Sequence, residues 1–167
     1  TKISQGKGAH ARQPLPAVLG MDLAGEVVAV GEGVTSLHTG EEVYAMAGGI
    51  GGQQGSLAEY ICVDADLVSR KPNNLSMREA AALPLVFITA WEGLVDRANV
   101  HAGQKVLVQG GAGGVGHIAV QIAKARGAQV YATASAKSRD AIESFGATAI
   151  DYNDQAPAEY MNQYTDG

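Results

Sequence analysis

A glycine-rich segment, residues 110–116, is the part of this sequence best suited to bind a ligand. Within it, Gly111, Gly113 and Gly116 have the spacing GxGxxG. An apolar run, 105–109, precedes the segment and an amphipathic run follows it, which is the context of a dinucleotide-binding turn. There the first glycine permits a tight turn, the second lets the main chain approach a diphosphate, and the third lets helix and strand pack closely. Because N–H groups at the start of a helix attract phosphate oxygens, the segment predicts a dinucleotide site; the alternative is a tight turn that binds nothing.

The end of the next apolar run indicates which nucleotide this turn would bind. Sites for NAD carry an Asp or Glu there, which binds the ribose 2′-hydroxyl. Here small hydroxyls and two cations follow instead, among them Ser135, Lys137 and Arg139, and the first acidic residue is Asp140. Cations and hydroxyls suit a 2′-phosphate, so the sequence predicts NADP(H) as the cofactor. The alternative is that the two cations form an ordinary solvated helix start.

Strands and helices alternate after residue 76, which predicts parallel strands with right-handed crossovers. Ser76 and Glu79 have the spacing of a capping box, and Pro84 suits the start of a second helix. Gly127 and Gly146 stand where later helices should end. The expected strands are 105–109, 129–133 and 147–150, and the expected helices are 77–83, 84–96, 115–125 and 139–145.

The first 75 residues have the pattern of short β-strands, expected at 24–30, 42–47 and 56–63. The segment 48–55 contains too much glycine for a regular element and is either a flexible surface loop or a loop that borders a cleft. We expect a domain boundary near residue 75.

Composition excludes several classes of protein. Of 167 residues, 46% are apolar and 17% charged, so the chain can bury a core and is not a disordered tail. The net charge of −5 and the scattered basic residues argue against a nucleic-acid partner. The longest apolar run, 80–91, falls short of the roughly 20 residues that a membrane span needs. A single cysteine and no signal peptide at the start of the chain predict a cytoplasmic α/β protein without membrane association.

Taken together, the segments 19–31, 57–60, 83–91 and the glycine turn resemble the medium-chain dehydrogenase/reductase superfamily, in the family's order. Within it, the chain is most similar to the zinc-independent quinone oxidoreductase (zeta-crystallin-like) branch. The resemblance implies that 1–75 is part of a GroES-like substrate domain and that 76–167 is the first half of a Rossmann domain. Because family members are longer and a doubly wound sheet has two halves, we expect a partial chain.

The resemblance also implies roles for individual residues. Thr89 should face the nicotinamide; by its position alone it could instead bond a helix carbonyl one turn back. Tyr152 is similar to a tyrosine that flanks the adenosine phosphate. The residues implied to lie on the diphosphate are Ala112, Gly113, Gly114 and Val115.

Two departures from the family's zinc enzymes bear on mechanism. Those enzymes have a His and a Cys ligand where this chain has Met21 and Leu85. A thioether and an aliphatic chain cannot build the N/S/O site of a catalytic zinc, so we expect no metal. Asp22 stands where the zinc enzymes carry an acid, and it either orients a site residue or caps a turn.

The chemistry that fits a metal-free site is hydride transfer from NADPH to an electron-poor acceptor, such as a quinone, enone or aldehyde. Two alternatives stay open: an enoyl-reductase domain of a polyketide or fatty-acid synthase, and a non-catalytic, crystallin-like NADPH-binding protein. The family resemblance further implies a homodimer. The sequence identifies neither the physiological substrate nor a proton donor.

Overall fold

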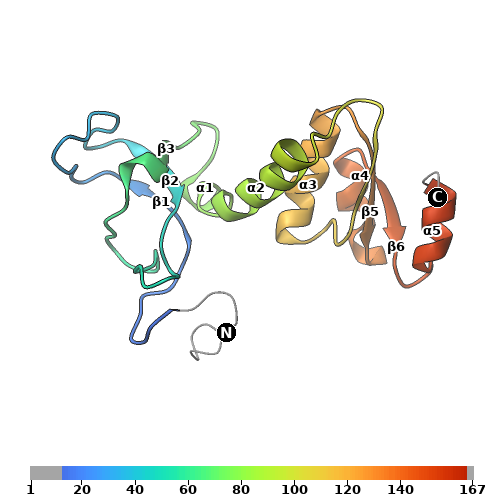
Figure 1. The fold of residues 1–167 in the computed structure, drawn as a ribbon, viewed down its shortest axis with the longest axis horizontal. Coiled ribbons are helices and arrows are strands. Elements are labelled where there is room, and N and C mark those ends of the chain that lie inside the picture. The colour runs from blue at the N-terminus through green and yellow to red at the C-terminus, as the bar shows by residue number, and fades with distance from the viewer. Residues whose placement is uncertain (1–12, 165–167) are drawn as a thin grey trace. The chain divides into compact units, whose positions relative to one another are not determined.

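The computed structural model describes residues 13–164, and the chain divides into two compact units between Leu85 and Val86. The first unit contains an antiparallel sheet and the second a parallel sheet (Figure 1). This mixed α/β organisation confirms the predicted fold class, whereas the domain boundary near residue 75 stays a prediction. Within the described range, no helix has the length and apolar character that a membrane crossing requires.

The sheet of the first unit is built from three short strands. They are β1 (Asp22–Glu26), β2 (Glu42–Met46) and β3 (Val68–Arg70), in the order β1–β2–β3. In the central strand, Tyr44 lies opposite Ala24 of β1 and Ser69 of β3. Val43 and Ala45, which alternate with Tyr44, are buried and supply part of the core of this unit.

Two of the three strands expected in this unit differ from the structure. The strand predicted at 42–47 is confirmed, but the one predicted at 24–30 begins at Asp22 and ends at Glu26. Val28 and Val30, which suggested a longer strand, are 60% and 44% exposed. They cover no core, and the valine pattern alone is therefore misleading.

No strand forms at 56–63, and the short strand β3 was not predicted. Leu57 and Tyr60 in the former segment are each 75% exposed. The N–H groups of Ser56 and Leu57 instead donate to the carbonyls of Gly20 and Leu19, outside any strand. This segment thus fastens the chain just before β1.

The glycine-rich loop 48–55 is fastened to the rest of the first unit. The buried side chain of Gln13 donates to the carbonyl of Gln53 at 2.6 Å and accepts from the N–H of Gly52 at 2.9 Å. A Cβ built on Gly55 would lie 2.3 Å from the carbonyl carbon of Leu19. These contacts hold the loop in place, and the close approach to Leu19 accounts for glycine at position 55.

A pair of short helices follows the first sheet. Helix α1 (Met77–Ala80) begins with the predicted capping box: Ser76 Oγ accepts from the N–H of Glu79, and the Glu79 carboxylate accepts from the N–H of Ser76. The Ser76 hydroxyl also donates to the Glu79 carboxylate at 2.7 Å; this hydrogen bond, followed by the one from the Ser76 N–H, holds the pKa of Glu79 below its ordinary value. The helix ends at Ala80, three residues before the expected end.

The next helix changes its hydrogen-bond pattern midway. Helix α2 (Pro84–Trp91) continues as a π-helix, η2 (Glu92–Arg97). Glu92 and Arg97 stand five residues apart, and the Nε of Arg97 donates to the Glu92 carboxylate at 2.9 Å. A π-turn brings i and i+5 together, and the sequence analysis did not foresee it within the helix expected at 84–96.

The second unit is a strand–helix–strand–helix–strand arrangement around a parallel sheet of order β4–β5–β6. Its elements are β4 (Lys105–Val108), α3 (Gly114–Ala125), β5 (Gln129–Ala134), the 3₁₀ turn η3 (Ala136–Ser138), α4 (Arg139–Ser144), β6 (Thr148–Asp151) and α5 (Pro157–Tyr164). All three strands and both expected helices are confirmed within one residue at each end. Gly127 and Gly146 follow their helices with φ of 83° and 79°, as a helix C-terminus requires.

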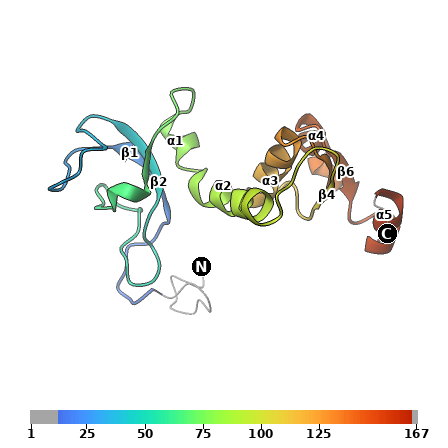
Figure 2. The ribbon, with the colours of Figure 1, turned by 45° about the horizontal axis from the view of Figure 1, so that its top comes forward.

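Helix α5 was not predicted, and it covers the sheet on the side away from α3 (Figures 1 and 2). Its Tyr160 packs into a buried cluster with Tyr131 and Ile150 of the sheet. Tyr164 stacks at a tilt on Tyr131, with 4.9 Å between the ring centroids. On the other side, Ile142 of α4 is fully buried. The sheet is thus covered on both faces, as in a doubly wound fold.

Candidate functional site

The predicted glycine turn joins β4 to α3 at the carboxyl end of the sheet. Gly110 has a φ of +68°, a left-handed conformation that glycine adopts without strain. Its carbonyl accepts from the N–H of Gly113 at 2.9 Å, which closes the turn. Gly113 is the N-cap of α3. The tight-turn role that the sequence analysis assigned to Gly111 therefore belongs to Gly110.

At Gly111 and Gly116 there is no room for a side chain, and at Gly113 the space is tight. A Cβ on Gly111 would lie 2.6 Å from Ala132 Cβ, and one on Gly116 would lie 2.1 Å from the Gly110 carbonyl oxygen. A Cβ on Gly113 would lie 3.2 Å from that same oxygen. At Gly116 the close approach is between the first turn of α3 and the Gly110 carbonyl of the turn, and the helix–strand packing role of Gly116 stays a prediction.

The mouth of the turn has the properties of an anion cradle. The first N–H groups of a helix have no acceptor within the helix, and these belong here to Gly114, Val115 and Gly116. The first turn of α3 contains no acidic residue that would compete for them. Residues 112–115 are exposed. Main-chain donors, the positive end of the helix dipole and bare glycines together fit a diphosphate.

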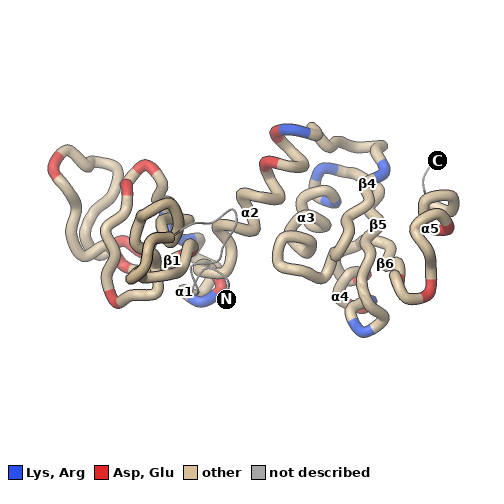
Figure 3. Tube along the Cα trace, turned by 60° about the horizontal axis from the view of Figure 1, so that its bottom comes forward, with Lys and Arg blue, Asp and Glu red and all other residues tan. Residues whose placement is uncertain are grey.

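The segment after β5 lies at the same carboxyl edge, because the two strands are parallel neighbours. Ser135 is the N-cap of the 3₁₀ turn η3, and Lys137 within that turn is exposed. Arg139, at the start of α4, forms an ion pair with Glu143 at 3.4 Å. Among the described residues, no ion pair includes Lys137. Figure 3 shows basic residues at this end of α4 (blue).

Tyr152 and Thr89 come from two further elements of the site. Tyr152 directly follows β6, and its N–H donates to the carbonyl of Ala134 at 3.3 Å, which ties it to the end of β5. Its side chain is exposed. Helix α2 reaches the turn through Val86, whose Cγ1 would lie 3.5 Å from a Cβ on Gly114. Thr89 follows Val86 by three residues and therefore lies on the same side of that helix.

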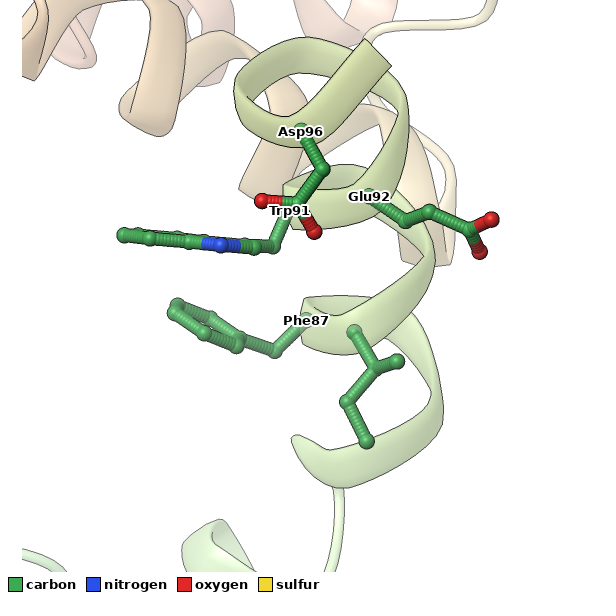
Figure 4. Close-up of a pocket in the computed structure, with 5 residues that line it drawn as sticks. Phe87, Trp91, Glu92 and Asp96 are labelled. Atoms are coloured by element: carbon green, nitrogen blue, oxygen red, sulfur yellow. The ribbon is translucent and has the colours of Figure 1, made fainter.

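An apolar hollow of about 490 Å³ opens on α2 and η2 (Figure 4). The rings of Phe87 and Trp91 stack with 5.7 Å between centroids and 25° between planes. Glu92 and Asp96 place carboxylates at the edge of the hollow. The sequence alone does not point to these residues, because aromatic side chains at i and i+4 of an apolar helix usually belong to a core.

In the first unit, Asp22 caps the start of α2. Its carboxylate accepts from the N–H of Leu85, 63 residues later, at 2.8 Å. Two roles were considered for Asp22, orienting a site residue and capping a turn. The hydrogen bond from Leu85 supports a capping role, although what Asp22 caps is the start of a helix. Partial burial raises the pKa of the Asp22 carboxyl, and the hydrogen bond from Leu85 opposes that rise.

Two substitutions should separate the hydrogen bond of Asp22 from its charge. Asp22→Ala removes the acceptor and should lower the free energy of unfolding by about 1 kcal/mol. Asp22→Asn keeps an oxygen acceptor without the charge. Because folding raises the pKa of Asp22, the wild type should lose stability relative to Asp22→Asn as the pH rises above 3.8 and through the raised value. Urea unfolding of both proteins across this pH range measures the difference; a change in the opposite direction would contradict the role of burial.

Two positions at which the family's zinc enzymes have ligands carry other side chains here. Met21 and Leu85 offer a thioether and an aliphatic side chain. Among residues 13–164, no three or more His, Cys, Asp or Glu side chains are grouped so that they could hold a metal ion. The donor set therefore does not fit a catalytic zinc.

Two family models match the chain. One describes an alcohol dehydrogenase GroES-like domain and matches residues 1–73. The other describes a zinc-binding dehydrogenase and matches residues 114–167. Their order agrees with a GroES-like domain followed by a dinucleotide-binding domain.

Curated relatives are similar over most of this chain. It is 45% identical over 170 residues to the chloroplastic NADPH-dependent alkenal/one oxidoreductase of Arabidopsis thaliana, covering 98% of this chain and 44% of the relative. It is also 48% identical over 133 residues to the polyketide synthase GfsB of Streptomyces halstedii, covering 80% of this chain and 2% of that protein. The chain therefore spans less than half the length of these relatives.

Solved structures share the fold. An alcohol dehydrogenase superfamily protein from Novosphingobium aromaticivorans is 56% identical with a TM-score of 0.94, over 98% of this chain and 49% of that one. The quinone oxidoreductase of Escherichia coli, solved with NADPH, is 29% identical with a TM-score of 0.82, over 94% of this chain and 48% of that one.

Proposed function

Because the chain belongs to the medium-chain dehydrogenase/reductase superfamily, we propose that it transfers a hydride from NADPH to a quinone or another conjugated carbonyl compound, without zinc. The observation that carries this proposal is the glycine turn, whose exposed main-chain donors fit a diphosphate. Similarity to an NADPH-dependent alkenal/one oxidoreductase and to a quinone oxidoreductase solved with NADPH supports the choice of cofactor and acceptor.

The proposed cofactor contacts divide between the elements at the carboxyl edge of the parallel sheet. The main chain of 111–116 holds the diphosphate. Ser135, Lys137 and Arg139 bind the 2′-phosphate, and Tyr152 flanks the adenosine. Thr89 faces the nicotinamide ring from α2. When bound, NADPH supplies the hydride, and the residues of the chain orient it and exclude water.

Zinc independence rests on the chemistry at the two ligand positions. With Met21 and Leu85 in place of His and Cys, these two positions do not supply the ligands of a zinc ion that would polarise an isolated carbonyl or alcohol. A conjugated acceptor does not need one, because its own π-system takes up the charge of the added hydride. This favours quinones and enones over saturated carbonyls.

The proposal is tested by following NADPH oxidation in the intact protein. The panel consists of a quinone, a 2-alkenal, an enone and a saturated aldehyde, each with and without a metal chelator. We expect oxidation with the conjugated acceptors and an unchanged rate with chelator. Loss of activity with chelator would contradict zinc independence, and NADPH binding without oxidation of any acceptor would favour the non-catalytic reading.

The match to a polyketide synthase favours a second candidate, an enoyl-reductase domain. A 2-enoyl thioester added to the panel distinguishes the two functions. A much higher kcat/KM for the thioester than for the free enone would support the synthase reading. For the protein as a whole we further propose a homodimer in the cytoplasm, which analytical ultracentrifugation and cell fractionation would check.

A further inference from the structure

Thr133 is a polar residue in the most buried strand of the second unit. Its neighbours in β5, Ala132 and Ala134, are buried, and Thr133 itself is 6% exposed. A buried hydroxyl is costly unless it forms a hydrogen bond. The Oγ1 of Thr133 forms one: it accepts from the N–H of Gly110 at 3.0 Å, 23 residues away in the chain.

The main chain of Thr133 binds the same turn. Its carbonyl accepts from the N–H of Gly111 at 2.9 Å. The two peptide groups that flank the Cα of Gly110 are thus both fastened to one residue, and this fixes the left-handed conformation of Gly110. The carbonyl of Gly110 in turn accepts from Gly113 and lies against Gly116. A single threonine therefore sets the geometry from which the mouth of the turn is built.

We propose that Thr133 is a positioning residue for cofactor binding: its side-chain oxygen holds Gly110 so that the N–H groups at the start of α3 converge on the diphosphate. This inference rests on the proposed function, and it adds a residue that does not itself touch the cofactor. The main-chain bond to Gly111 is available to any residue at position 133, whereas the bond to Gly110 requires a hydroxyl. Valine would fill the same buried space but would leave the Gly110 N–H without its acceptor.

The test compares Thr133→Val and Thr133→Ser in the intact protein, with Thr148→Val as a matched control. Thr148 lies in the same sheet, in β6, and is exposed. Two ligands are titrated: NADPH, which has the diphosphate, and adenosine 2′-phosphate, which lacks it. Thermal unfolding of each variant is recorded beside the titrations.

We expect Thr133→Val to raise the Kd for NADPH about tenfold or more, as for loss of one buried hydrogen bond, and to leave the Kd for adenosine 2′-phosphate within about twofold. Thr133→Ser should restore NADPH binding, and Thr148→Val should behave as wild type. If Thr133→Val does not fold, Thr133→Ala takes its place with the same expectation.

The outcomes separate this inference from the proposed function. Wild-type protein that binds no NADPH would overturn the proposed function and the inference with it. Wild-type protein that binds NADPH, with an equal Kd for Thr133→Val, would overturn the inference alone. Equal weakening of both ligands, or no recovery in Thr133→Ser, would also overturn it, because either would indicate a general role in stability.

Discussion

Replacing Gly116 with alanine should raise the Kd for NADPH by roughly 5- to 100-fold. The new Cβ would lie 2.1 Å from the Gly110 carbonyl oxygen, so helix α3 and the turn must move apart. That oxygen also accepts the N–H of Gly113, and the movement would therefore disturb the main-chain donors at the mouth of the turn. Overpacking of this kind costs about 1–3 kcal/mol in well-packed regions, and each 1.4 kcal/mol is a factor of ten in binding.

A glycine elsewhere in the same unit provides the control. Gly93, in η2, has nothing within 4 Å of a built Cβ and has no left-handed φ. Gly93→Ala should therefore bind NADPH as the wild type does. Fluorescence titration of both variants, with circular dichroism to check folding, measures the effect. A folded Gly116→Ala protein with wild-type affinity would show that the turn is not the cofactor site.

The second unit was predictable because its local signals agree with its tertiary structure. Apolar runs indicated the three parallel strands, and in β5 and β6 almost all residues are buried. Glycines marked the helix ends at Gly127 and Gly146. The turn at 110–116 was found from spacing and context alone. Helix α5 escaped notice because it contains no apolar run longer than two residues; Tyr160 and Tyr164 pack it on the sheet.

The first unit was less predictable because distant residues determine it. Gln13 fastens a loop 40 residues away, and Asp22 caps a helix 63 residues away. Neither partner can be deduced from spacing in one sequence. The segments 24–30 and 56–63 have strand-like patterns, but Val28, Val30, Leu57 and Tyr60 within them are exposed. The pattern in these segments therefore does not correspond to a buried face.

Within the candidate site, the sequence identified the binding residues better than the residues that hold them. It assigned the tight turn to Gly111, although the left-handed residue is Gly110. It assigned no role to Thr133. The sequence did contain a signal: a threonine in an otherwise apolar run is expected to be buried, and a buried hydroxyl needs a hydrogen-bond partner. The partner itself could be found only once the strand order was known.

Replacing both Lys137 and Arg139 with alanine should lower kcat/KM for NADPH roughly 30- to 100-fold and change that for NADH little. Hydrogen bonds to charged groups are worth about 1.5–3 kcal/mol. NADH has no 2′-phosphate, so it forms no such hydrogen bonds with these two side chains and should be little affected by their removal. Lys137 should account for most of the effect, because Arg139 already pairs with Glu143 at 3.4 Å. Steady-state kinetics of the two single variants and the double variant, with both cofactors, measure the contributions.

Substitution of Lys124 is the control for the loss of positive charge. Lys124 lies in the last turn of α3, about 15 Å along the helix from Gly114, and is therefore far from the proposed diphosphate site. Lys124→Ala should leave both cofactors nearly unaffected at physiological salt, where charges beyond about 8 Å are largely screened. An equal loss with NADPH and NADH in the double variant would contradict the 2′-phosphate assignment. The two cations would then be an ordinary solvated helix start, and the preference for NADPH would have to come from elsewhere at the carboxyl edge of the sheet.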